Sequence, residues 1–202
     1  MVRTPVLEIR YAGDELLTEL ADLAAGGIHE PGTMPFSIPW TLATSPQLER
    51  SSLKFWWGQR ASWSPDRWQF TGAVIVKGRP VGVQDLMAEN FSTTRSVSTG
   101  SWLGAAFQRQ GIGKEMRSAI LHLAFEGLGA AIADSSAFED NVASLATSRA
   151  LGYVDNGDEV VSRLGRPARM VRLKLARGIW GQQRRDDIEV LGLDRCREWF
   201  GA

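Results

Sequence analysis

The sequence contains very little cysteine and has no excess charge of either sign. Cys196 is the single cysteine among 202 residues, so the chain forms no internal disulfide, which is typical of a reducing cytosol. Lysine and arginine together number 23, as do aspartate and glutamate, and the formal net charge is zero. Proteins that bind nucleic acid or anionic membranes usually carry a basic excess. The composition therefore predicts neither partner, and any anion must be bound by a local group of residues.

Long apolar runs are also missing. No run approaches the length of about 20 residues that spans a membrane, and residues 1–10 lack the apolar core of a secretory signal peptide. Hydrophobic residues nonetheless make up 44% of the chain, which is enough for one domain with a substantial core. We expect a cytoplasmic protein, and we expect no metal site.

Residues 96–128 organise the chain, because they read as a strand, a glycine-rich turn and a helix. Val97, Thr99, Ser101 and Leu103 recur with the period of two that is typical of a strand. Beyond the turn, apolar residues recur at helical spacing and form one face, made of Ile112, Met116, Ala119, Ile120, Leu123 and Ala124. The sequence thus predicts a strand followed closely by an amphipathic helix.

The turn between them is suited to an anion. Gly111 and Gly113 lie where the helix begins, with Arg109, Lys114 and Arg117 close by. A helix start exposes unpaired N–H groups and a partial positive charge, and glycine lets an anion approach that backbone. Phosphate is the usual ligand of such a place. A plain strand-to-helix turn is the alternative, since glycine pairs of this kind are common.

The residues around the turn favour the anion site over a plain strand-to-helix turn. Gln108, Gly111 and Gly113 form the pattern Gln-x-x-Gly-x-Gly, which resembles the acyl-CoA signature of the GNAT N-acyltransferase superfamily. The pair Trp102 and Leu103 ahead of it resembles the branch that acetylates ribosomal-protein N-termini. Three further segments, at residues 27–31, 34–41 and 194–197, resemble an actinobacterial subgroup that includes a mycobacterial protein known to bind succinyl-CoA.

The resemblance implies the GNAT acyl-CoA N-acyltransferase fold, a mixed α/β (α+β) structure. Its mostly antiparallel sheet is flanked by helices and is splayed between the fourth and fifth strands, where CoA lies. The backbone of residues 102–104 is implied to pair with the pantetheine arm, with the Leu103 N–H as oxyanion donor. The residues implied to bind the coenzyme are Trp102, Leu103, Gly104, Gln108, Arg109, Gln110, Gly111, Ile112, Gly113, Lys114, Asn141 and Ser144.

A second motif follows the central helix. Asn141, Ser144 and Ser148 are spaced so that they share one face of a helix, and they resemble the GNAT helix that flanks the thiol of CoA. By spacing alone, Asn141 is a good N-cap and the serines face solvent; with the first motif present, the functional interpretation is favoured. Many GNAT enzymes place a tyrosine as general acid at the position of Ser148. Here Ser148, Ser144 or a water is left to protonate the leaving thiolate.

The residues that would bind the acceptor of the acyl group are less well defined. Met34, Phe36 and Trp40 lie in a proline-rich segment, residues 28–44, and are expected either to wall the acceptor pocket or to plug the core. No general base stands out. Five carboxylates near the edges of the motifs are possible, and each is more typical of a surface or capping residue: Glu30, Asp85, Glu89, Glu139 and Asp140.

The rest of the chain reads as alternating elements in a mixed order. Strands are predicted at 6–11, 68–77, 80–87, 130–135, 153–161 and 170–175, helices at 14–25 (capped by Asp14), 45–63 and 141–151, and a polar loop at 88–94. We assign residues 1–177 to one N-acyltransferase domain. Residues 178–202 are too apolar for a free tail and are expected to pack on the domain or on a dimer partner.

These observations predict a CoA-dependent N-acyltransferase. It would move an acetyl or succinyl group from acetyl-CoA or succinyl-CoA to a primary amine, by direct attack in a ternary complex, and it would form a homodimer or higher homo-oligomer. A non-catalytic acyl-CoA-binding module is the alternative, because the usual tyrosine is missing and the base is unassigned.

Overall fold

The computed structural model describes all residues, 1–202, and its framework is one sheet of nine strands in the order β7-β8-β6-β5-β4-β3-β2-β1-β9. The strands are β1 (Val2–Arg3), β2 (Glu8–Tyr11), β3 (Arg67–Val76), β4 (Arg79–Glu89), β5 (Ser96–Leu103), β6 (Ile132–Phe138), β7 (Val154–Arg163), β8 (Arg166–Ala176) and β9 (Glu189–Val190). Every neighbouring pair is antiparallel except β5 and β6, which are parallel. This confirms the mixed α/β fold with a mostly antiparallel sheet.

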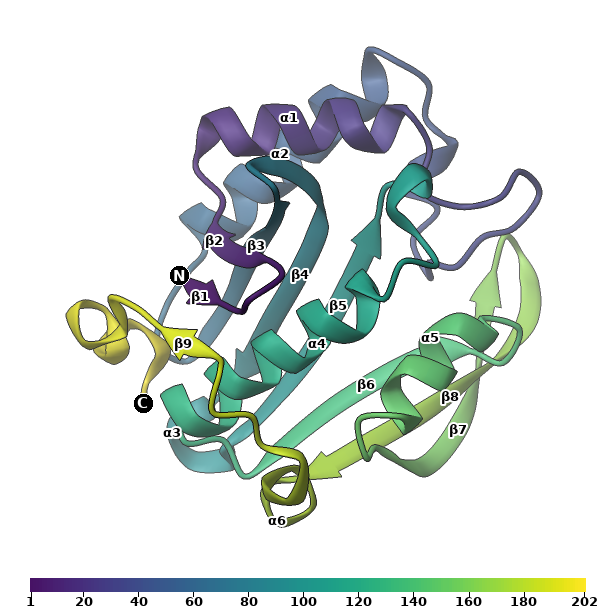
Figure 1. The fold of residues 1–202 in the computed structure, drawn as a ribbon. Helices are drawn as coiled ribbons and strands as arrows, with labels where there is room; N and C mark the ends of the chain where they lie inside the picture. The colour runs from purple at the N-terminus through teal and green to yellow at the C-terminus, as the bar shows by residue number, and fades with distance from the viewer.

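Helices cover both faces of this sheet (Figure 1). They are α1 (Asp14–Ala25), α2 (Gln47–Ala61), α3 (Phe91–Thr94), α4 (Ile112–His122), α5 (Val142–Arg149) and α6 (Arg177–Trp180). Helices α1 and α2 pack against β3 and β4 from one side, whereas α4 packs on the other side, next to α5. The central part of the sheet is therefore sandwiched between α1 and α2 on one face and α4 on the other.

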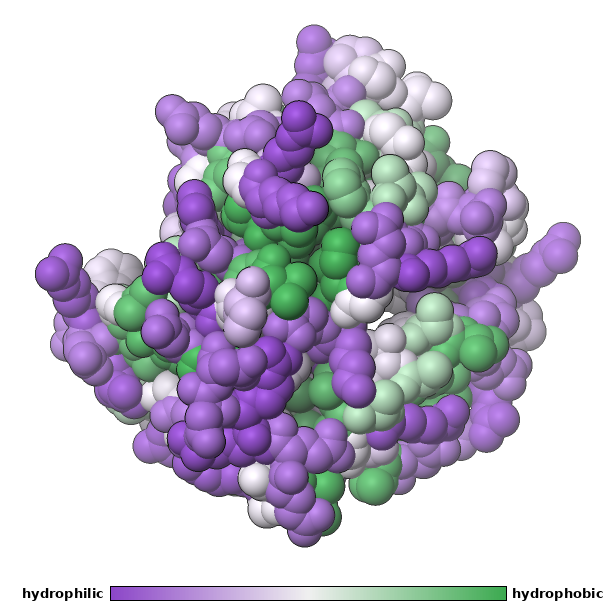
Figure 2. Space-filling view, in the orientation of Figure 1, coloured by the Kyte–Doolittle hydropathy of each residue, from purple (hydrophilic) through white to green (hydrophobic).

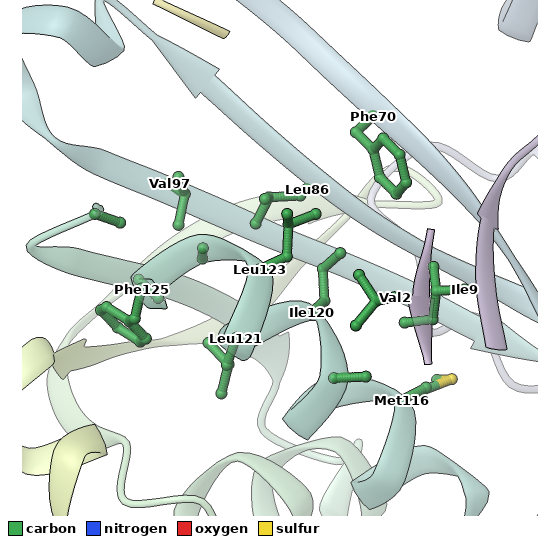
Figure 3. Close-up of a cluster of buried hydrophobic side chains, with 14 of the residues drawn as sticks. Val2, Ile9, Phe70, Leu86, Val97, Met116, Ile120, Leu121, Leu123 and Phe125 are labelled. Carbon is green, nitrogen blue, oxygen red and sulfur yellow. The ribbon is translucent and has the colours of Figure 1, made fainter. Parts of the chain in front are cut away.

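The main core lies between α4 and the sheet. Ile120 and Leu123 of the α4 segment face Leu86 of β4 and Val97 of β5, and Val2 and Ile9 close one end (Figure 3). All of these side chains are buried. The helical face read from the sequence is thus the face that packs on the sheet, as burial of apolar area requires.

The segment after β8 returns to the same core. Trp180 stacks on Phe125, with ring centroids 5.0 Å apart, and Phe200 packs edge-on against Trp68 at 4.9 Å. The Trp68 indole N–H donates to the carbonyl of Phe200 over 3.0 Å, and β9 pairs with β1. Contacts of this kind stabilise the chain end against the rest of the molecule.

Local details differ from the sequence prediction at several points. Gly13, not Asp14, is the N-cap of α1, because the Asp14 carboxylate accepts hydrogen bonds from Arg60 and Trp57 of α2 instead. Residues 88–94 are not a plain loop: β4 extends to Glu89 and α3 follows. The predicted helix of residues 45–63 is shorter, and α4 continues as one π-helical turn over Leu123–Gly127.

Two absences complete the description. None of the helices combines the length and the apolar character needed to cross a membrane. No group of three or more His, Cys, Asp or Glu side chains is arranged to hold a metal ion.

Candidate functional site

The sheet divides between β5 and β6. The two strands pair only over Ser96–Ser98 and Ile132–Asp134, and beyond this point they run apart (Figure 1). One edge of β5 therefore has no partner strand from Thr99 to Leu103. The structure confirms a sheet splayed between these two strands, the fourth and fifth of those read from the sequence.

The free edge of β5 presents backbone groups in a fixed alternation. Gly104 donates its N–H to the carbonyl of Val81 over 3.0 Å, which sets the register of bonded pairs between β4 and β5. In an antiparallel ladder every second residue directs its N–H and C=O away from the partner strand. Ser101 and Leu103 are those residues, so the Leu103 N–H points into the gap toward β6.

The close fit of β4 and β5 at this point depends on Gly82. A Cβ at residue 82 would lie 2.2 Å from the carbonyl oxygen of Trp102 and 2.9 Å from the Cα of Leu103. Real Cβ atoms do not approach backbone so closely, so any other residue would push β5 away. Gly82 thus fixes where the Leu103 backbone lies.

The turn into α4 opens beside the same edge. Arg109 and Gly111 have φ angles of +59° and +81°, and Gly111 is the N-cap. The first bond of the helix runs from the Glu115 N–H to the carbonyl of Gly111 over 3.2 Å, which leaves the N–H groups of Ile112, Gly113 and Lys114 without a helical partner. Figure 2 shows a hollow between this turn and the side chains over α5. The exposed amides and the positive end of the helix dipole suit a phosphate group.

The backbone conformation calls for glycine at residue 111 but not at residue 113. Gly111 needs glycine for its backbone conformation, whereas Gly113 lies in ordinary helical backbone. A Cβ built on Gly113 would have only one neighbour within reach, the Cδ1 of Leu103 at 4.0 Å. Nothing in the fold demands glycine at residue 113, so the open space there is available to a ligand.

Gln108 serves the protein's own backbone through its side chain. Its amide donates to the carbonyl of Ile28 over 2.7 Å and to that of Leu103 over 2.9 Å. Ala105 also donates its N–H to the carbonyl of Gly27. These bonds tie the end of β5, the turn and the segment after α1 together, so the contact expected between Gln108 and the coenzyme would use its backbone. The neighbouring Gln110 side chain bonds to the carbonyl of Ala106.

The second motif lies across the gap, on α5. The Asn141 side chain accepts a hydrogen bond from the N–H of Ser144 over 3.2 Å and so caps the helix. Ser144 is partly exposed, but Ser148 is completely buried. The three residues do lie on one side of α5, yet only Ser148 points into the interior.

An arginine that the sequence analysis placed only near the glycine turn is a central feature of the site. Arg117 of α4 is 4% exposed, and its Nη1 donates to the hydroxyls of Ser135 (3.3 Å) and Ser148 (3.1 Å). Its Nη2 donates to Ser101 over 3.1 Å. The guanidinium therefore spans β5, β6 and α5 where the strands separate. No sequence signal marks it, because a charged residue beside a helical apolar face is usually solvated.

On the opposite face of the sheet, Asp85 of β4 is the carboxylate with the most perturbed acidity. Its Oδ1 is buried and has no hydrogen-bond partner. Burial raises the pKa of Asp85 to about 7, although the nearby polar side chains of Thr71 and Gln69 act in the opposite sense. A sequence signal exists here, since Asp85 follows Val81 and Val83 in alternation on a strand with buried faces.

Asp85 lies beside a glycine on β5 and close to a cavity. It pairs with Gly100, and a Cβ built there would be 3.9 Å from the Asp85 Oδ2. The next pair along the same face, Met87 and Ser98, lines a cavity of about 460 Å³ together with residues of α2 and β3. Because Gly100 has no side chain, β5 places nothing beside the Asp85 carboxyl at this pair, and the Met87 Cε would lie 3.6 Å from a Cβ added there.

Met34, Phe36 and Trp40 lie at the other end of β5, and none of them lines that cavity. Met34 is buried, while Phe36 and Trp40 are half-buried with ring centroids 5.4 Å apart. Trp40 also packs on Trp102, at 6.1 Å. These side chains cover the α1 side of the β5 end.

Comparison with known families decides what kind of domain this is. The acetyltransferase (GNAT) domain family matches residues 15–154, which is more than half of the chain. The chain belongs to the GNAT acetyltransferase family. The matched region contains the glycine turn, Arg117, Asp85 and α5, so the whole candidate site lies in the GNAT domain.

Solved structures show the same fold. The ribosomal L7/L12 alpha-N-protein acetyltransferase RimL, in complex with CoA, has a TM-score of 0.71 at 17% identity and covers 86% of this chain and 95% of its own. A GCN5-related N-acetyltransferase from Brucella melitensis has a TM-score of 0.66 at 17% identity, with coverage of 99% and 84%. The yncA protein from Salmonella typhimurium, solved with its cofactor acetyl-CoA, has a TM-score of 0.61 at 14% identity, with coverage of 85% and 94%. At these identities the similarity establishes the GNAT fold alone.

Proposed function

We propose that this GNAT protein is a CoA-dependent N-acyltransferase that moves an acetyl or succinyl group from acyl-CoA to a primary amine. One observation carries the proposal. The unpaired amides at the start of α4 open beside the free edge of β5, at the point where the sheet divides. A diphosphate at one and an extended pantetheine arm along the other would use both sets of free backbone groups.

Each part of the coenzyme has a matching part of the chain. The N–H groups of residues 110–114 would bind the diphosphate, with Arg109 and Lys114 as nearby cations. The pantetheine arm would pair as a strand with the outward backbone groups of this edge, those of Ser101 and the N–H of Leu103. Of the residues 102–104 expected to pair with it, Gly104 donates its N–H to β4 instead, and the Leu103 carbonyl already accepts from Gln108. The outward N–H of Leu103 would stabilise the negative charge that develops on the thioester oxygen. Support for this role is the alternation of hydrogen bonds between β4 and β5.

We place the amine on the α1 and α2 side of the sheet, with Asp85 as its general base. A carboxyl with a pKa of about 7 is half ionised near neutral pH, which suits a group that takes a proton from an ammonium or amine. Gly100 presents no side chain beside the Asp85 carboxyl, on the face of β5 from which the amine would approach the thioester. The cavity beside Met87 would hold one part of the acceptor, and Met34, Phe36 and Trp40 would bound the other end of the acceptor site.

Direct attack in a ternary complex follows from this arrangement. The amine nitrogen would attack the thioester carbon from one face while CoA is held from the other, so no covalent acyl-enzyme is needed. Binding both reactants beside β5 converts a bimolecular step into one within the complex, which lowers its entropic cost.

The experiment that tests this function has two stages. Calorimetric titration with acetyl-CoA and succinyl-CoA in parallel should show saturable binding, and the tighter donor identifies the acyl group. Transfer from that donor to peptides and small amines should then release free thiol. Absence of binding by either thioester to well-folded protein would refute the proposal, while binding without transfer to any amine would favour an acyl-CoA-binding module.

We also propose a cytoplasmic homodimer built from a domain of residues 1–177 and an extension of residues 178–202. Trp180 and Phe200 pack in the chain's own core, which supports an extension that belongs to its own domain. Trp199, at 58%, is the most exposed of the three large apolar side chains that this extension offers to a partner, the others being Ile179 and Leu191. Sedimentation of Trp199→Ser against the parent protein tests that contact without removing the core residues of the extension.

A further inference from the structure

Arg117 is a buried cation without a counter-ion. Its guanidinium is bonded to three serine hydroxyls and forms no ion pair, and its Nε is buried with no partner at all. Taking a charge out of water costs several kcal/mol per ion in proteins, and neutral hydroxyls offset only part of this. An anion bound beside Arg117 would therefore stabilise this buried charge.

The place of this cation is defined by the divided sheet. Pairing of β5 and β6 ends at Ser98 and Asp134, and Ser135 is the next residue of β6. Arg117 bridges Ser101 and Ser135, so it lies between the strands just beyond their last pair. The third hydroxyl, Ser148, comes from α5 on the far side of the gap.

A second buried polar group at the same place also lacks a partner. The Tyr153 hydroxyl is buried and has no well-formed hydrogen bond, although the side chains of Thr99 and Arg117 lie close to it. Burial raises the pKa of Tyr153, and the charge of Arg117 acts in the opposite sense, which places the two groups near each other. The Arg117 Nε and the neighbouring Tyr153 hydroxyl are thus two buried polar groups with unused hydrogen-bonding capacity, and a bound anion beside the guanidinium would use it.

We propose that the Arg117 guanidinium stabilises the CoA thiolate that leaves during acyl transfer, with the Ser148 hydroxyl as a second donor to sulfur. The assignment rests on the proposed function, because that reaction generates an anion at the end of the pantetheine arm. Ser148 accepts from Arg117 through its oxygen, so its own hydrogen is free to point at the sulfur.

The step balances without a proton from Arg117. The amine nitrogen forms a bond to the acyl carbon, the carbon–sulfur bond breaks, and its electron pair stays on sulfur. The proton lost by the nitrogen passes to the Asp85 carboxylate and then to solvent. The thiolate remains paired with Arg117 until solvent protonates it on release, and the arginine keeps its charge throughout.

The test measures the acidity of the product thiol in its bound state. Free CoA is added to saturation, and the thiolate is followed by its ultraviolet absorbance as pH is raised. In the parent protein we expect the pKa of the bound thiol at or below about 7.5, as for thiols beside cations. In Arg117→Met it should return to about 8.5, and Arg117→Lys, which keeps the charge, should give an intermediate value.

Turnover supplies the second measurement. Arg117→Met should lower kcat about a hundredfold, the effect of removing one donor to a developing anion, with little change in the KM for acyl-CoA. Arg177→Met is the matched control, since Arg177 is an exposed arginine paired with Glu126, and it should change neither value. If Arg117→Met does not fold, Ser148→Ala replaces it in the titration, and we expect it to raise the pKa of the bound thiol by a smaller amount.

Three results would overturn the assignment. An equal thiol pKa in the parent and in Arg117→Met would show that the cation does not act on sulfur. A selective loss of succinyl-CoA turnover, with acetyl-CoA turnover intact, would assign Arg117 to the carboxylate of the acyl group instead. Failure of the parent protein to bind CoA or any acyl-CoA would overturn the proposed function first, and this assignment with it.

Discussion

Replacing Gly113 by alanine should change protein stability and acyl-CoA affinity in opposite directions. The Gly113 backbone is helical, and the nearest atom to an added Cβ is the Leu103 Cδ1 at 4.0 Å, an ordinary contact. Replacing glycine by alanine at such a position stabilises a protein by about 0.4–1 kcal/mol, chiefly by reducing the freedom of the unfolded chain. For a chain of this size, we expect Tm to rise by about 1–4 °C.

The same methyl group would stand where the diphosphate is proposed to meet the helix amides. We expect Gly113→Ala to bind acyl-CoA at least tenfold more weakly, a loss of about 1.4 kcal/mol or more. Opposite signs for the two effects are the essential result, because a mutation that damages the fold would lower both stability and affinity.

Thermal melting and calorimetric titration measure the two quantities on one preparation. Gly58→Ala is the matched control: Gly58 is an exposed glycine in α2 with no neighbour within 4 Å of an added Cβ. It should raise Tm to a similar degree and leave the affinity for acyl-CoA unchanged. If Gly113→Ala binds acyl-CoA as tightly as the parent, the helix amides are not the diphosphate site.

Three further predictions address the acceptor side and the chain end. Because the pKa of Asp85 is raised to about 7, the folded protein keeps a proton that the unfolded chain loses, so the free energy of unfolding should fall as pH rises from about 4 to about 7. Asp85→Asn should flatten this slope and lower turnover at pH 7 by about a hundredfold or more; equal turnover in both proteins would exclude Asp85 as base. Phe36→Ala should change the preference among amine acceptors, and unaltered turnover with a lower Tm would show that Phe36 is only a core plug. Phe200→Ala, which removes a buried ring packed on Trp68, should cost about 3–5 kcal/mol of the free energy of unfolding in denaturant titration; a loss below 1 kcal/mol would mean that the chain end is not part of the core.

The sequence by itself determined the features that depend on neighbouring residues. The alternation at Val97–Leu103 and the helical spacing after Gly111 define a strand, a turn and a helix, and both elements are present as β5 and α4. Such periodicities arise because one face of each element is buried, so they can be read locally. The glycine turn, the mixed order of elements and the divided sheet followed from this reading and from the GNAT resemblance.

Only the tertiary structure decided the contacts between residues far apart in the chain. Arg117 meets Ser148 at a separation of 31 residues, and the Trp68 indole meets the Phe200 carbonyl at a separation of 132. Neither contact has a sequence period, because each joins elements that are far apart in the chain: α4 and α5 in the first case, β3 and the last turn in the second. Whether Arg117 is solvated or buried, and whether Asp85 is an ordinary carboxylate or one with a pKa of about 7, depends on which strands and helices enclose it.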